Sequence, residues 1–116
     1  MKSVRVVHEA SGIQLGSRVA VADSWWHRLR GLLARPRMRA GDGLLLMDCT
    51  SVHTVGMTYA IDVAFLDADG TIVRKIPRLA PCRVGIGGPE AVHALELPAG
   101  RLDDTGTVAG VRLSWS

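Results

Sequence analysis

The stretch AIDVAFLDADGTIVRKI, residues Ala60 to Ile76, has the pattern of a β-hairpin. Its first part alternates as a strand does, which places two sets of side chains on opposite faces: Ile61, Val63 and Phe65, and Asp62, Ala64 and Leu66. Asp69-Gly70 is a strong signal for a tight turn between antiparallel strands. The residues TIVRKI then return as the partner strand. The sequence therefore predicts two paired strands in the middle of the chain.

The same β pattern recurs along most of the chain. Short apolar or alternating runs, separated by turn residues, predict further strands on both sides of the hairpin. They are expected at residues 4–7, 13–15, 18–22, 43–48, 92–97 and 110–115. The region from Pro77 to Pro89 contains three prolines and is expected to be a loop.

One helix is expected, from about residue 24 to residue 34. Five large apolar residues recur there at three- and four-residue spacing: Trp25, Trp26, Leu29, Leu32 and Leu33. Such spacing is typical of an amphipathic helix that packs on a core, and Pro36 would end it. The chain is therefore predicted to be a single mainly β domain over residues 1–116. We expect a small antiparallel β-barrel or sandwich of about seven short strands with one amphipathic α-helix.

The composition is that of a globular domain, since 47% of the 116 residues are hydrophobic and 22% are charged. Apolar runs such as Leu44 to Met47 are far too short to span a membrane. The first residues, MKSVRVVHEASG, lack the long apolar core of a signal peptide. The two cysteines, Cys49 and Cys82, are far apart and in no C-x-x-C pair, which does not suggest a disulfide framework. We therefore expect a cytoplasmic protein.

Positive charge is concentrated in one segment. Five of the arginines lie between Arg28 and Arg39, in RLRGLLARPRMR, although the net charge of the chain is only +3. This segment is either a solvated helix face or a surface that meets phosphate or an acidic partner. Few aromatic residues are present for base stacking, and no nucleic-acid motif occurs, so nucleic-acid binding is not expected.

Two carboxylates fall where a charge is costly. Asp62 and Glu96 each share a strand face with small or apolar residues. An ionised carboxylate there needs hydrogen-bond donors or a charged partner. The two groups are either an acid–base pair in a cleft or structural carboxylates that accept bonds from backbone N–H groups or an arginine. We favour the structural role, with Arg35 as the first side-chain partner because it follows the predicted helix.

Metal and cofactor sites are not predicted. His53 and His93 could ligate a metal together with Asp62, Glu96 or Cys49, but no pair of them has a helical or hairpin ligand spacing. His93 shares its expected strand face with leucines and is better explained as a half-buried histidine. No nucleotide-binding or hydrolase fingerprint occurs in the sequence.

Four segments together resemble a known family. They are GLLAR at 31–35, His53-Thr54 with Met57, IDVAFLD at 61–67 and LELPAG at 95–100. In this combination, over about residues 13 to 114, the chain is similar to the bacterial and archaeal family called domain of unknown function 192. Leu33 and Cys82 depart from the family pattern, which has a methionine and in many members an aromatic residue there. The resemblance implies a compact mainly β domain with one helix, and no established activity.

Three functions follow as hypotheses. The favoured one is a non-catalytic small-ligand-binding or accessory domain, with a groove between the helix and the loops near Met57 and Cys82. The second is a small acid–base or hydrolase-like enzyme that uses Asp62, Glu96 and His53. The third is a basic interaction module that meets an acidic protein through residues 28–39. The candidate site residues are His53, Thr54, Met57, Asp62, Glu96 and Arg35.

Overall fold

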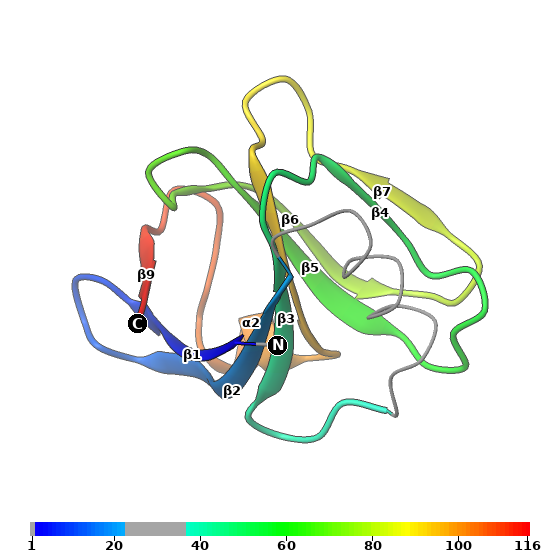
Figure 1. Ribbon diagram of the computed structural model, residues 1–116, viewed down its shortest axis with the longest axis horizontal. Helices are drawn as coiled ribbons and strands as arrows, with labels where there is room; N and C mark the ends of the chain where they lie inside the picture. Colours follow the sequence, from blue (N-terminus) through cyan, green and yellow to red (C-terminus); the bar gives the residue numbers. More distant parts are fainter. Residues whose placement is uncertain (1, 23–36) are drawn as a thin grey trace.

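The computed structural model describes residues 2–22 and 37–116 (Figure 1). The chain is mainly β, as the sequence predicts. In chain order the elements are β1 (Lys2–His8), β2 (Gln14–Ala22), β3 (Asp42–Leu46), β4 (Ser51–His53), β5 (Ile61–Leu66), β6 (Ile72–Leu79), β7 (Val84–Ile86), β8 (His93–Pro98), α2 (Arg101–Asp104) and β9 (Leu113–Trp115). The helix expected from residue 24 to residue 34 lies outside the described residues.

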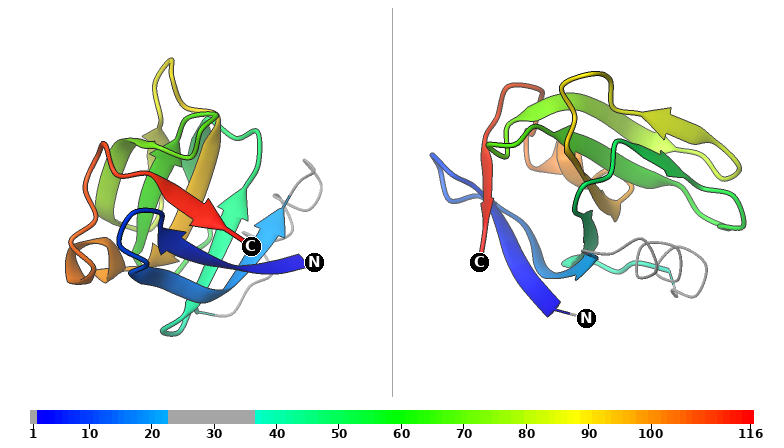
Figure 2. Two further views of the ribbon diagram at one scale, coloured as in Figure 1. Left: turned by 90° about the vertical axis from the view of Figure 1, so that its left-hand side faces the viewer. Right: turned by 45° about the horizontal axis from the view of Figure 1, so that its top comes forward.

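Seven of the strands form one curled sheet, and the other two form a separate ribbon. The sheet order is β6-β5-β8-β3-β2-β1-β9, and β4 pairs with β7. A single bridge between Thr71 and Arg112 joins the two ends of the sheet, which gives it the curved shape seen in Figure 2. The β4–β7 ribbon lies at the upper right of Figure 1, away from β1 and β9. The expected hairpin at the centre of the chain is the β5–β6 pair, with Val63 opposite Ile76.

One strand pair is parallel. All the other strand pairs in the described part of the chain are antiparallel, but β2 and β3 run in the same direction, with Val19 opposite Gly43. Parallel neighbours need a long crossover connection, because the chain must return to the same end of the sheet. Residues 23–41 make this connection between β2 and β3.

The sheet has an apolar core on each of its two sides. The inner core fills the concave side and contains, among others, Leu45, Ala64, Leu66, Leu95 and Leu102. The outer core lies on the other side and contains, among others, Leu44, Val63, Phe65, Val52 and Met57. The strands β5 and β8 are buried over almost their whole length because both of their faces are covered. This explains the nearly continuous apolar sequence of β5.

The region from Pro77 to Pro89 is not a loop throughout, so this expectation was wrong. Strand β6 continues through Pro77 to Leu79, and residues Val84–Ile86 form β7. A proline is tolerated in β6 because this strand lies at the edge of the sheet. On the outer side of an edge strand, backbone N–H groups have no neighbouring strand to bond, so the missing N–H of a proline costs little there. The next residue, Arg78, has a positive φ of 51°.

A short helix, α2, follows β8 and was not expected from the sequence. Its N-cap is Gly100, which has a φ of 92° in the left-handed region that glycine adopts most easily. Its one buried residue is Leu102, which packs in the inner core. No helix among residues 2–22 and 37–116 is long and apolar enough to cross a membrane.

Candidate functional site

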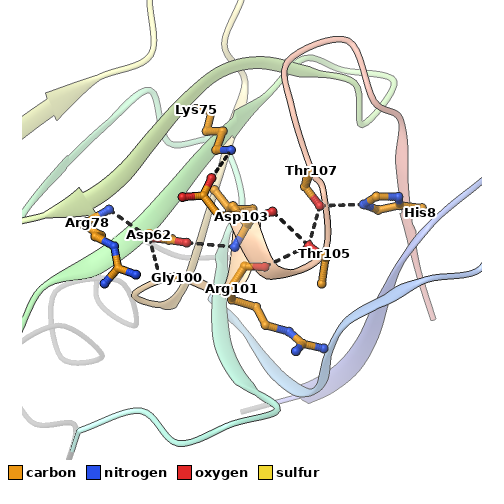
Figure 3. Close-up of polar contacts among 10 residues, drawn as sticks. His8, Asp62, Lys75, Arg78, Gly100, Arg101, Asp103, Thr105 and Thr107 are labelled. Atoms are coloured by element: carbon orange, nitrogen blue, oxygen red, sulfur yellow. Dashed lines mark hydrogen bonds and ion pairs between the residues drawn. The ribbon is translucent and has the colours of Figure 1, made fainter.

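Asp62 lies at the centre of a hydrogen-bond network on the inner side of the sheet (Figure 3). Its side chain is fully buried, with 0% exposure. The oxygen Oδ1 accepts the backbone N–H of Arg78 at 2.9 Å and that of Gly100 at 3.1 Å, and Oδ2 accepts the N–H of Leu102 at 2.9 Å. Three donors on one carboxylate offset much of the cost of burying its charge.

This network gives Asp62 a structural role. The N-cap of α2 is a glycine and has no side chain to accept the free N–H groups of the first turn. Asp62 supplies that acceptor from β5, and the same carboxylate holds the end of β6 at Arg78. The partners are backbone N–H groups, the first of the two classes expected from the sequence. The other expected partner, Arg35, lies outside the described residues.

Glu96 lies on the other side of the sheet from Asp62. It is also fully buried, and its neighbours in register are Leu44 on β3 and Val63 on β5. Both of these belong to the outer core, whereas Asp62 alternates with Ala64 of the inner core. The structure therefore does not bring Asp62 and Glu96 together. A shared proton or a direct acid–base relay between them is ruled out by the sheet that separates them.

Thr54 follows β4 and bonds to the loop that precedes β7. It is fully buried, its hydroxyl donates to the carbonyl of Ala80 at 2.6 Å, and it accepts the N–H of Arg83 at 2.8 Å. The carbonyl of Thr54 accepts the N–H groups of Met57 and Cys82 at 3.1 and 3.0 Å. Three of the residues highlighted in the sequence, Thr54, Met57 and Cys82, are thus brought together by backbone geometry.

His53 and Met57 have different environments within this region. Met57 is 8% exposed and packs in the outer core. His53 is half-buried on β4, and its Nδ1 atom is buried without a hydrogen-bond partner in the part of the chain that the structure describes. No group of three or more His, Cys, Asp or Glu residues that could hold a metal ion occurs among residues 2–22 and 37–116.

A hollow with a basic rim lies where the chain enters β3. We call it the basic hollow; its volume is about 680 Å³, and its described lining consists of Arg37, Met38, Arg39 and Asp42. Met38 is 9% exposed and belongs to the outer core, so it gives the hollow an apolar wall. Arg37 and Arg39 are exposed.

The charges around the basic hollow are unevenly paired. Asp42 accepts the Nε–H of Arg18 at 3.1 Å and the backbone N–H of Arg39 at 2.9 Å. The guanidinium of Arg37 lies 5.7 Å from the ring centroid of Tyr59. Within the described residues, neither Arg37 nor Arg39 forms an ion pair with a carboxylate. No carboxylate within the described residues therefore neutralises either guanidinium group.

The sequence pointed to part of this hollow. Arg37 and Arg39 belong to the basic segment that ends at Arg39. Met38, Asp42 and Tyr59 were not among the candidate residues. The available signal was the order Arg37-Met38-Arg39, because an apolar residue between two charged residues is typical of an extended segment with one face on an apolar surface.

The comparisons with known proteins agree with the motifs. The family model of domain of unknown function 192 (DUF192), described as "Uncharacterized ACR", matches residues 6–115. The chain belongs to the DUF192 family. A UPF0127 protein of Thermococcus sibiricus is 28% identical over 114 residues, which are 95% of this chain and 73% of that protein. A UPF0127 protein of Pyrococcus horikoshii is 27% identical over 95% of this chain and 97% of its own length.

Two crystal structures are similar to this one. A protein of Sinorhizobium meliloti, described provisionally as a transcription regulator, has a TM-score of 0.82 and 26% identity, with 97% of this chain and 91% of that chain covered. A protein of unknown function from Novosphingobium aromaticivorans has a TM-score of 0.76 and 18% identity, with coverage of 96% and 92%. The resemblance stated from the sequence motifs is confirmed by the family match.

Proposed function

We propose that this DUF192 protein is a non-catalytic binding domain for a small molecule with an apolar body and one anionic group. The observation that carries the proposal is the basic hollow, where two guanidinium groups without carboxylate partners among the described residues stand beside the buried side chain of Met38. Its volume of about 680 Å³ lies in the range of known small-molecule sites.

Each part of the hollow supplies a different element of recognition. A guanidinium group can donate two parallel hydrogen bonds to a carboxylate or phosphate, which fixes the orientation of the anion. Stacking on Tyr59 restricts Arg37 before the ligand arrives, and a restricted side chain loses less entropy on binding. Asp42 is held by Arg18, so its charge is partly neutralised at this site. Met38 gives the apolar body of the ligand a surface to cover.

A binding role agrees better with the carboxylates than an enzymatic one. Asp62 is fully used by three backbone donors, and Glu96 lies on the opposite side of the sheet. An acid–base enzyme would need these groups in one solvent-reachable cleft with His53. The structural use of Asp62 therefore supports the non-catalytic reading.

Isothermal titration calorimetry with octanoate tests the proposal. We expect octanoate to bind and 1-octanol to bind about tenfold more weakly, because the alcohol lacks the charge that the arginines recognise. A double variant, Arg37→Gln with Arg39→Gln, should lose about tenfold or more in affinity for octanoate. Arg83→Gln is the control, because Arg83 is an exposed arginine in a different loop. Its side chain donates a hydrogen bond to the carbonyl of its neighbour Cys82.

Two results would contradict the proposal. Equal binding of octanoate by the double variant and the parent would show that Arg37 and Arg39 do not bind the anionic group. Equal binding of acetate and octanoate would mean that the apolar wall is not used, which is the behaviour of a plain cationic surface for an acidic partner. DNA is a further probe in the same titration, because the similar Sinorhizobium meliloti protein is described provisionally as a transcription regulator.

We also propose that the protein is cytoplasmic and prokaryotic. Neither Cys49 nor Cys82 forms a disulfide in the described part of the chain, which supports a reducing compartment. The relatives named above come from archaea and bacteria. Fractionation of the source cells with an antibody against the protein would test the location.

A further inference from the structure

A second hollow lies at one end of the curled sheet, far in sequence from the basic hollow. It lies between the β1–β2 turn and the chain before β9, and we call it the barrel-end pocket. Its volume is about 490 Å³, and its lining includes His8, Glu9, Ala10, Gly110, Val111 and Arg112. Val111 packs against the inner core, so the pocket opens over the end of that core.

His8 forms the polar part of this pocket. It lies on β1 in the same alternation as Val4 and Val6 of the inner core, and it is 8% exposed. Its Nε2 atom is 2.6 Å from the hydroxyl oxygen of Thr107, which is fully buried. The Thr107 hydroxyl is in turn 2.7 Å from the hydroxyl of Thr105 (Figure 3).

A chain of hydroxyl groups leads from His8 to the carbonyl of Arg101. The Thr105 hydroxyl has one hydrogen and lies 2.9 Å from the carbonyl of Arg101 and 3.2 Å from that of Leu102, which can only accept. Each of the three contacts along this chain receives one hydrogen when Thr107 donates to Thr105 and accepts from His8, and we infer this arrangement. In this arrangement Nε2 of His8 is the donor, and Nδ1 of a neutral ring has a lone pair.

This lone pair is available to a ligand. Within the described residues, no protein group bonds to Nδ1 of His8, and the atom is not among the buried polar atoms without a partner. Nδ1 is therefore not completely enclosed by the described residues, although most of the ring is buried. An acceptor fixed in this way inside an apolar pocket favours a ligand that brings one donor.

The rim of the pocket favours an uncharged ligand. Glu9 and Arg112 form an ion pair with 3.1 Å between Oε2 and Nε, so the two charges neutralise each other. The backbone also ties these walls together, because the N–H of Glu9 donates to the carbonyl of Arg112 at 3.0 Å. The pocket is thus preformed and has no net charge on its rim.

We propose that the barrel-end pocket binds a small neutral molecule with an apolar body and one hydroxyl group, which donates its hydrogen to Nδ1 of His8. An alcohol or a phenol has this chemistry. The Nε2–H of His8 stays bonded to Thr107, so the ring does not need to turn when the ligand binds. This site is independent of the basic hollow.

Nuclear magnetic resonance of protein labelled with ¹⁵N tests this proposal, with phenol and benzene as probes. We expect the spectrum of the free protein to show His8 protonated at Nε2 when its ring is neutral. Phenol should shift the Nδ1 resonance of His8 and the amide resonances of Ala10 and Gly110. Benzene, which has the same ring but no donor, should bind about tenfold more weakly.

A pair of variants locates the site without touching the hydroxyl chain. Ala10→Trp places a large side chain at the pocket lining and should weaken phenol binding about tenfold or more. Val108→Trp is the control, because Val108 is an exposed residue that is not part of the lining. A proton on Nδ1 of neutral His8, equal binding of phenol and benzene, or equal loss in both variants would each overturn the proposal.

Discussion

Replacing Asp62 with asparagine should destabilise the protein by about 2–4 kcal/mol. Asparagine keeps one acceptor oxygen, which can still receive the N–H groups of Arg78 and Gly100. Its amide NH₂ then faces the N–H of Leu102 across the 2.9 Å that the carboxylate now bridges. A lost hydrogen bond to a charged group costs about 1.5–3 kcal/mol, and a buried N–H without an acceptor costs about 1–3 kcal/mol. Removal of a buried charge offsets part of this sum.

Urea unfolding followed by circular dichroism measures this difference. The control is Asp104→Asn on the same short helix, which should change the free energy of unfolding by no more than about 0.5 kcal/mol because Asp104 is exposed. Amide hydrogen exchange at Leu102 should also become faster in the Asp62→Asn variant. If that variant is as stable as the parent, Asp62 does not hold β6 and α2 together. That result would favour an enzymatic role for Asp62, since active-site groups can often be removed without loss of stability.

Three further changes test the same region. Gly100→Ala should cost about 1–2 kcal/mol in a urea melt, because the φ of 92° is strained for any residue with a Cβ atom. Leu102→Ala should cost about 2–5 kcal/mol, because its side chain is fully buried in the inner core. The Lys75 ammonium donates a hydrogen bond to Asp103 and attracts its charge, and both effects lower the pKa of Asp103. The stability linked to this pair is present above the ordinary pKa of an aspartate and is lost as the pH falls through the lowered value. Lys75→Gln should therefore raise the pKa of Asp103 in a ¹³C titration, and an unchanged pKa would show that the pair does not form.

The strands could be predicted from the sequence because their signals are local. The alternation in β5 and the turn at Asp69-Gly70 need only neighbouring residues to be recognised. The parallel pairing of β2 with β3 is different, since these two strands are separated by residues 23–41 and no local signal shows in which direction they pair. Pro77 was taken as a strand breaker because the sequence does not reveal that β6 is an edge strand.

The candidate site was harder to predict, for a similar reason. The charge of Asp62 was recognised as costly, but its partners are backbone groups 16, 38 and 40 residues away. Nearly every residue has a backbone N–H group, so no sequence motif identifies the three that bind Asp62. The sequence of each strand also predicts which residues share a face. It does not predict which face of β8 lies on the same side of the sheet as a given face of β5. The separation of Asp62 from Glu96 therefore needed the three-dimensional register.

Methyl NMR of the methionines during an octanoate titration tests the binding role most directly. The chain has four methionines, of which Met38 lines the basic hollow and Met47 packs against the inner core. We predict that octanoate shifts the methyl resonance of Met38 in a saturable way and leaves that of Met47 unchanged. A titration that leaves Met38 unchanged, or that moves both resonances equally, would contradict the account.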